Sequence, residues 1–402
     1  MSETLRLVVC GGGNGSQALS GLAASRPNTH VTLFTLFQDE AARLKAAMGE
    51  EGIKVIQHRA HKEPEVFQGK PHVVTKNAAE AIPGCDMIVF VLPAFAFSEY
   101  LHAMKEHLQP GMSLVAAPGQ AGFEFEARSI LGDKYKDCTV ASFESLPWAC
   151  RASEFGRQVD LLGEKETIIG AVEEGLVPAK KKPIESLQYC IGPKPKLIIG
   201  SNSLVAISLM SVNAYIHPPI FYGSWKNWDQ KPLKEKPLFY HGLSEESAKI
   251  MDKVSDEVVE IGKAIQRQCP NANMASVKTL YDYYMRVWSA EIEDPTNIYT
   301  VMKTMIPYKT LYHPMKEVEG GFVPDFSNRY VTEDIPFGLV VLRGIGEVAG
   351  VKTPMMDECL AWFEKETGKK YIVDGKCEGK DISSTRAPQR YGFKTIDDML
   401  GF

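Results

Sequence analysis

The segment Leu5-Arg-Leu-Val-Val-Cys-Gly-Gly-Gly-Asn-Gly-Ser16 decides the fold of the first half of this chain. An apolar, β-prone run leads into a glycine-rich turn, and a helical pattern rich in Ala, Leu and Ser follows. Gly11 and Gly13 occupy the first two positions of the pattern G-x-G-x-x-G/A, and the small Ser16 stands at the third. Glycine permits the tight turn and lets backbone N–H groups approach a pyrophosphate at the helix N-terminus. The context, a strand before the turn and a helix after it, predicts a dinucleotide-binding unit.

The composition is that of an ordinary globular protein. The chain has 402 residues, enough for two domains, with 44% hydrophobic and 24% charged residues. A net charge of −5 argues against nucleic-acid binding, and the longest apolar run, residues 87–97, is too short to span a membrane. The eight cysteines are scattered without a C-x-x-C pair, which favours reduced thiols over a disulfide framework or a zinc site. We expect a cytoplasmic protein without a metal, membrane or nucleic-acid partner.

The first half of the chain alternates strand-like and helix-like segments, which predicts a parallel sheet covered on both faces. After the first strand, further strands are expected at residues 30–36, 86–92, 113–117, 139–143 and between 158 and 172, with a surface excursion at 57–71. The carboxyl ends of parallel strands meet at one edge, where open α/β sheets bind ligands. The predicted fold class is α/β, with a Rossmann-type doubly wound sheet over residues 1–199.

Beyond residues 192–196 the pattern changes to long helices. They are expected at residues 201–216, 244–268, 276–292, 332–349 and 355–367. Ser244, followed by Glu245 and Glu246, is an N-cap signal for the second of them. We therefore predict a mainly α-helical C-terminal domain over residues 200–402, with the active site in a cleft between the two halves.

The end of the second strand, Thr35-Leu-Phe-Gln-Asp39, should select the cofactor. An acidic residue about 20 residues after the glycines accepts the ribose hydroxyls of NAD, whereas an arginine pairs with a 2′-phosphate. Asp39 comes slightly late and is alternatively the cap of the next helix, and Arg43 lies a helical turn further on. The pattern favours NAD(H) over NADP(H). Phe37 either lies against the adenine or is a half-exposed aromatic at the strand end.

His217, in Tyr215-Ile-His-Pro-Pro-Ile-Phe-Tyr222, is the first candidate for chemistry. The pattern places it at the end of a helix that the two prolines prevent from continuing. Histidine exchanges a proton near neutral pH, so His217 is a candidate acid/base residue. The alternative is a helix-terminal histidine that bonds the last carbonyl groups.

A second candidate is the segment Asn328-Arg-Tyr-Val-Thr-Glu-Asp-Ile-Pro336. A helix start at Thr332 would hold Arg329 and Asp334 close together. The arginine offers a planar fork for a carboxylate, and the aspartate can orient a histidine. The alternative is a helix-capping aspartate beside a surface arginine.

Two loops of the first half complete the candidates. Gln120 offers a donor and an acceptor near the expected nicotinamide edge. Cys150 is a candidate nucleophile, but no adjacent base or metal partner is visible in the sequence, which favours a small, buried apolar role.

Several longer motifs resemble the opine dehydrogenase family, in particular its marine-invertebrate members, and the resemblance covers the whole chain. The motifs are Gly11-Gly-Gly-Asn-Gly15, Pro118-Gly-Gln-Ala-Gly-Phe-Glu-Phe125, Leu146-Pro-Trp-Ala-Cys150, His217-Pro218, the segment 328–336 and Arg386-Ala-Pro-Gln-Arg-Tyr-Gly-Phe393. The resemblance implies a monomeric, NADH-dependent enzyme that reductively condenses pyruvate with the amine of an amino acid. The products are an N-(1-carboxyethyl) amino acid, water and NAD⁺, which the reaction regenerates in anaerobic glycolysis.

The resemblance also implies roles for the candidate residues. His217 would be the catalytic acid/base and Asp334 its partner, Gln120 would contact pyruvate, and Arg329 would hold a carboxylate or lie near the cofactor. The implied cofactor-binding residues are Gly11, Gly12, Gly13, Asn14, Gly15, Phe37, Gln38, Asp39, Glu40, Ser145 and Cys150. Ser145 keeps the hydroxyl of a position where relatives can carry threonine.

The sequence leaves the amine substrate open. Ser211 lies six residues before His217, nearly two helical turns, so we expect it on a shared face as part of the pocket. Tyr281, Tyr283 and Tyr284 belong to the pocket or to the core. No acidic cluster marks a site for arginine, so alanine, glycine and taurine are as credible. The alternatives to an opine dehydrogenase are a hydroxy-acid or glycerol-3-phosphate-type dehydrogenase and a non-catalytic NADH-binding sensor.

Overall fold

The computed structural model describes residues 3–58 and 63–401. The chain divides into two compact units, one ending at Ile207 and one beginning at Ser208. The predicted boundary lies after residue 199. The first unit extends further because strand β12 (Lys196–Ser201) still belongs to its sheet, where it pairs with β11 (Thr167–Glu173).

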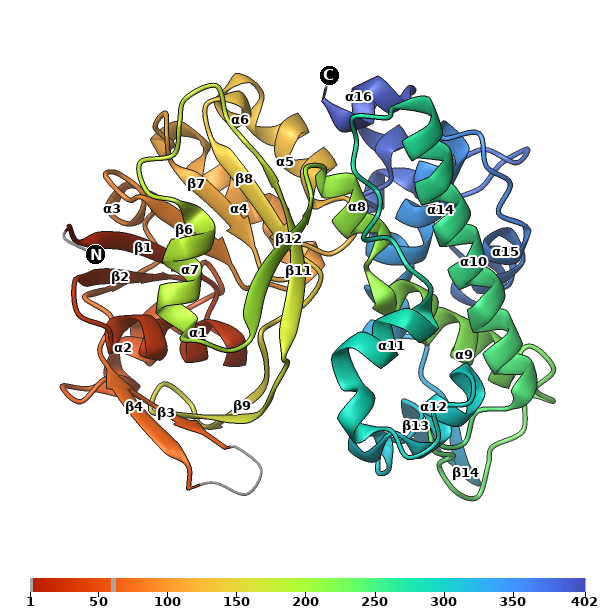
Figure 1. Cartoon of the computed structure of the whole chain (residues 1–402). Coiled ribbons are helices and arrows are strands. Elements are labelled where there is room, and N and C mark those ends of the chain that lie inside the picture. The colour runs from red at the N-terminus through yellow and green to blue at the C-terminus, as the bar shows by residue number, and fades with distance from the viewer. Residues whose placement is uncertain (1–2, 59–62, 402) are drawn as a thin grey trace. The chain divides into compact units, whose positions relative to one another are not determined.

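The first unit is built on an eight-stranded sheet with the order β12-β11-β8-β7-β6-β1-β2-β5 in the described residues (Figure 1). The strands other than β11 and β12 are β1 (Leu5–Cys10), β2 (Thr29–Phe34), β5 (Val73–Thr75), β6 (Met87–Phe90), β7 (Ser113–Ala116) and β8 (Thr139–Phe143). From β5 to β8 neighbouring strands are parallel, whereas β11 is antiparallel to β8. Strand β1 lies between β2 and β6. The chain runs from β1 to β2 on one side and later returns to β6 on the other side, so the strand order reverses at β1. Sheets of this type bind ligands at such a reversal.

A second, four-stranded sheet has the order β4-β3-β10-β9. Its strands are β3 (Ile53–Gln57), β4 (Glu65–Gly69), β9 (Trp148–Glu154) and β10 (Gln158–Glu164). The predicted surface excursion at 57–71 is therefore wrong for β4, which pairs with β3 along its whole length; residues 59–62 lie outside the described residues. Helix α1 (Asn14–Ala24) contacts strands of both sheets.

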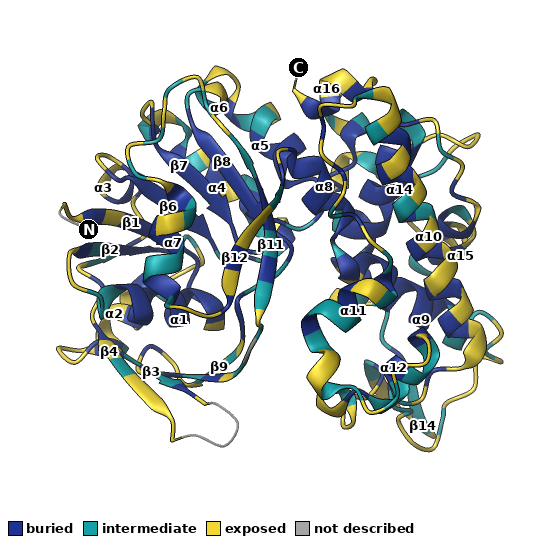
Figure 2. Ribbon diagram, in the orientation of Figure 1, coloured by how far each residue is buried: buried dark blue, intermediate teal, exposed yellow. Residues whose placement is uncertain are grey.

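Alternate residues of the central strands face the two sides of the large sheet. Met87 and Val89 of β6 pack in the same core as α1. Phe90 points the other way and contacts the rings of Phe97 and Phe123 at 5.4 and 5.8 Å between centroids. These belong to α4 (Phe97–Met104) and α5 (Phe123–Leu131), so both faces are covered, and the central strands are buried (Figure 2). The unit also contains α2 (Glu40–Met48), α3 (Ala78–Ala81), α6 (Asp133–Lys136), α7 (Pro183–Ile191) and the start of α8 (Leu204–Leu209).

The second unit is mainly helical and is organised around α10 (Glu245–Gln268). Ser244 accepts a hydrogen bond from the Ser247 N–H at 3.1 Å, which confirms the predicted N-cap. Helix α10 contacts α9 (His217–Trp225), α12 (Ile298–Thr304), α14 (Val340–Val348) and α15 (Pro354–Thr367). The other elements include α11 (Leu280–Trp288), α13 (Arg329–Thr332), α16 (Ile396–Leu400) and the hairpin of β13 (Met315–Val318) and β14 (Gly321–Pro324).

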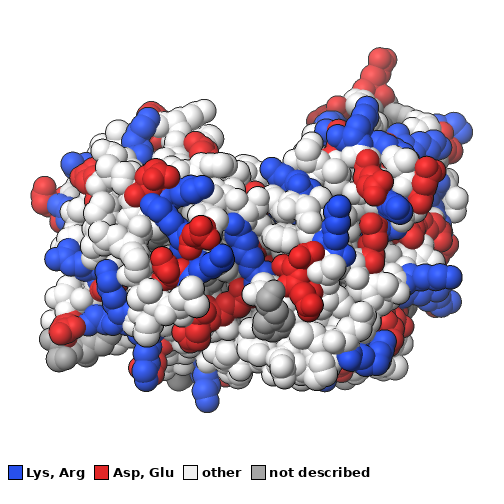
Figure 3. All heavy atoms as spheres, turned by 90° about the horizontal axis from the view of Figure 1, so that it is seen from above, with Lys and Arg blue, Asp and Glu red and all other residues white. Residues whose placement is uncertain are grey.

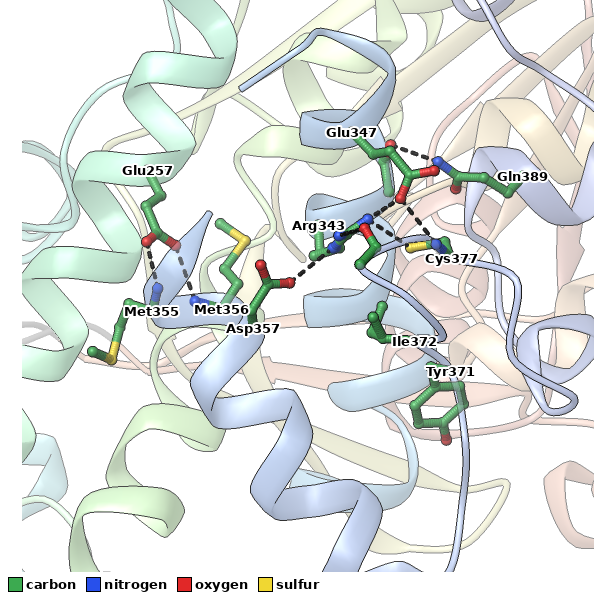
Figure 4. Close-up of polar contacts among 12 residues, drawn as sticks. Glu257, Arg343, Glu347, Met355, Met356, Asp357, Tyr371, Ile372, Cys377 and Gln389 are labelled. Carbon is green, nitrogen blue, oxygen red and sulfur yellow. Dashed lines mark hydrogen bonds and ion pairs between the residues drawn. The ribbon is translucent and has the colours of Figure 1, made fainter. Parts of the chain in front are cut away.

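A buried arginine fixes the chain that follows α15. Arg343 of α14 donates from Nε to Asp357 at 2.9 Å and also bonds Glu347 and the carbonyl oxygen of Gly375 (Figure 4). The N–H of Cys377 donates to Glu347 at 2.9 Å. The segment after α15 is therefore part of the core of this unit.

The N-terminus of α15 is capped from a neighbouring helix. The Glu257 carboxylate of α10 accepts the N–H groups of Met355 and Met356 at 2.6 and 3.0 Å (Figure 4). Burial raises the pKa of Glu257 to about 7. The link between α10 and α15 therefore depends on a carboxylate that titrates near neutral pH.

The face displayed in Figure 3 carries intermixed basic and acidic side chains. No helix of the described residues has the length and apolar character needed to cross a membrane. Across the same residues, no three His, Cys, Asp or Glu side chains are grouped to hold a metal ion.

Candidate active site

The glycine turn after β1 leaves open space at the N-terminus of α1. Gly11 has a φ of 105°, and a Cβ there would lie 2.9 Å from the Val91 carbonyl oxygen, so only glycine fits. Gly13 is the N-cap of α1, and a Cβ on it would meet no described atom within 4 Å. Within the described residues no side chain caps this helix. Uncapped N–H groups facing open space are the arrangement that binds a pyrophosphate.

Polar side chains of α1 hold the turn in this shape. Ser16, at the third motif position, donates from Oγ to the Val91 carbonyl oxygen at 3.1 Å. Gln17 donates to the Gly12 carbonyl oxygen at 2.7 Å. Asn14 accepts an N–H from the backbone of β9 at 3.1 Å. The turn is therefore braced by the end of β6 and by the second sheet.

Two acidic residues follow β2. Asp39 occupies the N-cap position of α2, but its carboxylate pairs with the exposed Arg43 at 3.0 Å and does not cap the helix. Glu40 lies against the glycine turn, since a Cβ on Gly12 would overlap its carboxylate. Phe37 is 60% exposed, so its ring is available to a ligand. Glu40, whose carboxylate also accepts a hydrogen bond from the Thr35 hydroxyl, therefore lines the glycine turn.

Gln120 and Ser145 follow adjacent parallel strands, β7 and β8, at the same edge of the sheet as the glycine turn. Gln120 has a φ of 58°, and Gln38 a φ of 45°. The Ser145 hydroxyl is buried with no hydrogen-bond partner among the described residues, so it can bond a ligand. Cys150 lies in β9, where burial raises the pKa of its thiol to about 11. A protonated thiol is a poor nucleophile, in agreement with the apolar role favoured above.

His217 begins a helix, and the prediction that it ends one is wrong. The predicted helix at 201–216 is interrupted: α8 ends at Leu209, a 3₁₀ turn covers Val212–Tyr215, and α9 starts at His217. Prolines stop a helix in its interior, but in the first turn their missing N–H groups are not needed. Pro218 and Pro219 therefore favour the start of α9.

His217 is paired with Asp334, as the sequence analysis expects. Nδ1 of His217 lies 2.7 Å from Oδ2 of Asp334, although the two residues are 117 positions apart. Only 6% of His217 is exposed. Burial raises the pKa of the Asp334 carboxyl group, and the hydrogen bond from His217 opposes that rise. An ionised Asp334 carboxylate only accepts hydrogen bonds, so in that state Nδ1 of His217 is the donor, and Nε2 is the ring nitrogen that does not face the carboxylate.

Arg329 lies close to this pair but has a different partner. Its helix, α13, starts earlier than predicted, after the Asn328 cap, and ends at Thr332. Arg329 donates from Nε to Glu333 at 2.5 Å, and its side chain is 66% exposed. The guanidinium group also lowers the pKa of Asp334 by its positive charge. Glu333, which lies one helical turn after Arg329, is not among the residues predicted from the sequence.

The residues expected to recognise the amine are dispersed. Ser211 precedes the 3₁₀ turn and is not on the helix of His217, so the predicted shared helix face is wrong. Tyr281 donates to the Pro295 carbonyl oxygen at 2.6 Å near the surface. Tyr283 and Tyr284 are buried, and the Tyr284 hydroxyl lies 3.0 Å from another tyrosine hydroxyl. Tyr283 and Tyr284 therefore belong to the core.

Two tyrosines outside the predicted site residues contact His217, and a third packs against one of them. The Tyr240 hydroxyl lies 2.9 Å from Nε2 of His217. The Tyr330 ring stacks on the imidazole with centroids 3.8 Å apart, and Tyr308 stacks on Tyr240, also at 3.8 Å. Tyr330 stands beside Arg329 in the selected motif, which could have indicated it. Tyr240 and Tyr308 carry no local sequence signal.

Known proteins resemble this chain along its whole length. A family model described as NAD/NADP octopine/nopaline dehydrogenase, alpha-helical domain, matches residues 200–367. Tauropine dehydrogenase from Arabella iricolor is 45% identical over 395 residues, which cover 98% of this chain and 99% of that protein. The chain belongs to the opine dehydrogenase family. Opine dehydrogenase from Haliotis discus hannai is 44% identical over 404 residues, covering 100% of this chain and 99% of the relative.

A solved structure of octopine dehydrogenase with NADH and L-arginine has a TM-score of 0.94 and 41% identity, covering 99% of this chain and 98% of that chain. The comparisons confirm the family, the class of enzyme and the fold class expected from the sequence. The roles of individual residues stay predictions.

Proposed function

We propose that this enzyme couples the oxidation of NADH to the condensation of pyruvate with the amino group of an amino acid, which yields an N-(1-carboxyethyl) amino acid. The observation that supports this best is the His217–Asp334 pair, because the condensation requires proton transfers that a hydride donor does not provide. Octopine dehydrogenase has been solved with NADH and L-arginine and with NADH and pyruvate, the two kinds of substrate that the proposed reaction joins.

The proton transfers follow from the chemistry of the substrates. The free amine attacks the keto carbon, the resulting hydroxyl leaves as water, and the imine is reduced to a secondary amine. In our proposal neutral His217 accepts the proton of the incoming ammonium group and returns a proton to the departing hydroxyl. Asp334 fixes the tautomer of the ring and stabilises its charged form.

The N-terminal unit fits NADH at the glycine turn. The uncapped N-terminus of α1 and the open space at Gly13 suit the pyrophosphate, and Glu40 suits the ribose hydroxyls. Ser145, with its unpartnered hydroxyl, is proposed for the nicotinamide side. The further residues proposed at this site are Gly11, Gly12, Asn14, Gly15, Phe37, Gln38, Asp39 and Cys150. When bound, NADH supplies the hydride that reduces the imine carbon.

Arg329 and Gln120 are proposed to bind the keto acid. A guanidinium group has five N–H donors, so Arg329 can hold Glu333 and still offer donors to a substrate carboxylate. Ser211 is proposed on the amine side. Arginine, alanine, glycine and taurine stay open as the amine. We also propose that the enzyme is a cytoplasmic monomer that regenerates NAD⁺ during anaerobic glycolysis.

The test is NADH oxidation, followed by its absorbance, with pyruvate and each amine in turn, and with each component omitted. The proposal requires oxidation that depends on both substrates. Oxidation with the keto acid alone would identify a hydroxy-acid dehydrogenase. NADH binding without turnover on any mixture would identify a sensor.

A further inference from the structure

Both ring nitrogens of His217 are occupied by side chains of its own unit. Nδ1 faces Asp334 at 2.7 Å, and Nε2 faces the Tyr240 hydroxyl at 2.9 Å. Tyr330 covers one face of the ring, with an interplanar angle of 13°. A proton that enters or leaves at Nε2 therefore meets the oxygen of Tyr240 first.

Tyr240 is held firmly in this position. Its ring is 5% exposed and stacks on Tyr308 at an interplanar angle of 19°. Phe239 contacts it edge-on at 4.8 Å between centroids, and the Tyr308 hydroxyl is itself 3.0 Å from that of Tyr284. Moving Tyr240 aside would break these packed contacts. The Tyr240 hydroxyl is therefore held in place beside Nε2 of His217.

The polar interactions continue outward from Tyr240. Its hydroxyl also interacts with that of Tyr330, which is only partly buried, and this interaction contributes to the raised pKa of Tyr240. A tyrosine hydroxyl can accept one proton while it donates its own. Asp334, His217, Tyr240 and Tyr330 thus form a series of interacting polar groups, in which His217 and Tyr240 are buried and Asp334 and Tyr330 are partly exposed.

We propose that Tyr240 relays protons between His217 and the substrate through Tyr330, an inference that rests on the proposed function. When His217 acts as an acid, its Nε2–H bond breaks and the proton joins the Tyr240 oxygen. In the same step the proton of Tyr240 passes to the Tyr330 oxygen, and the proton of Tyr330 passes to the hydroxyl that leaves the substrate as water. Both phenols are neutral before and after. When His217 acts as a base, the same transfers run in the opposite direction.

The burial of Tyr240 is compatible with this concerted transfer. Burial raises the pKa of its hydroxyl well above the ordinary value, so a lasting phenolate is unfavourable. A concerted relay never forms one. It also explains why an imidazole that is 6% exposed can serve a substrate without moving.

Tyr240→Phe tests the relay because it keeps the ring and its stacking and removes one oxygen. We expect kcat to fall on the order of 10²-fold, the usual contribution of one acid–base group. The solvent isotope effect on kcat should rise as proton transfer becomes rate-limiting, while the Kd for NADH stays unchanged. Tyr330→Phe keeps the stack on His217 and should show the same two changes. Tyr222→Phe is the matched control, since this hydroxyl on α9 donates to Glu358 at 2.5 Å and not to His217 or Tyr240.

The inference is overturned if either the Tyr240 or the Tyr330 variant keeps the wild-type kcat. It is also overturned if the rate falls while the solvent isotope effect stays at the wild-type value, because that result indicates a purely structural role. If Tyr240→Phe does not fold, as judged by thermal melting, Tyr330→Phe decides. If the wild type is active and Tyr240→Phe is equally active, only the relay is refuted. If the wild type is inactive with every amine, the proposed function is refuted, and the relay with it.

Discussion

Replacing Asp334 by asparagine should slow turnover without weakening cofactor binding. The carboxylate lies 2.7 Å from Nδ1 of His217, a short distance typical of a charge-assisted hydrogen bond. Hydrogen bonds to charged groups contribute about 1.5–3 kcal/mol. Each 1.36 kcal/mol changes a rate about tenfold, so the loss of the charge alone should lower kcat by about 10- to 150-fold.

The amide has a second effect. An asparagine in this place can donate to Nδ1, which moves the imidazole proton to Nε2 and turns the exchangeable nitrogen into a donor. The wrong tautomer adds to the loss, and we expect a total decrease in kcat on the order of 10²–10⁴.

The assay is the steady-state rate of NADH oxidation with saturating pyruvate and the best amine, alongside a fluorescence titration of NADH. Asp325→Asn is a matched control, since this carboxylate of the same unit pairs with Lys316 at 3.0 Å. The control should keep the wild-type kcat. If Asp334→Asn also keeps it, or loses only NADH affinity, the assignment of His217 and Asp334 is wrong.

Three further predictions concern other parts of the chain. Gly13→Asp should keep or raise the melting temperature, since aspartate is a good N-cap. It should nevertheless weaken NADH binding at least about tenfold, because its negative charge repels the pyrophosphate. Unchanged NADH affinity in a titration would show that the pyrophosphate does not bind at this helix N-terminus. Arg329→Lys should raise the KM for pyruvate because the planar fork is lost, and a change confined to the Kd of NADH would instead assign Arg329 to the cofactor. Glu257 has a folded-state pKa of about 7, above the ordinary glutamate value of 4.5, so the folded state binds more protons between these values and stability should fall as pH rises across that window. Urea unfolding at several pH values should show a smaller decrease for Glu257→Gln, and equal slopes would contradict the sign.

The local parts of the fold were predictable because the sequence signals agree with one another. A β-prone run, a glycine turn and a helical pattern all indicate the same β1–turn–α1 unit, which the structure contains. The Ser244 cap is another case, since its side chain bonds an N–H only three residues away. Such features depend on short stretches of chain.

The errors arise where one pattern has two interpretations. Pro218 and Pro219 forbid the continuation of a helix but are compatible with its first turn, so the sequence alone does not decide on which side of His217 the helix lies. Ser211 was assigned to the wrong side for the same reason.

The surroundings of His217 depend on tertiary structure. Tyr240 comes from a segment 23 residues away, and nothing near it in the sequence indicates chemistry. Whether Arg329 pairs with Glu333 or with Asp334 depends on where α13 starts. The structure starts this helix at Arg329, a few residues earlier than predicted, and Arg329 pairs with Glu333. Pairings of this kind require coordinates.

The tail of the chain has a consequence for anyone who shortens this protein. The family model ends at residue 367, the last residue of α15, yet the N–H of the fully buried Arg386 donates to the Pro336 carbonyl oxygen at 3.2 Å, two residues beyond Asp334. Truncation at residue 367 would also remove the Gly375 carbonyl oxygen that Arg343 bonds, and the buried guanidinium group would then have fewer hydrogen-bond acceptors. A fragment that ends at residue 367 would therefore lose the contact that braces the chain beside Asp334, the proposed partner of His217.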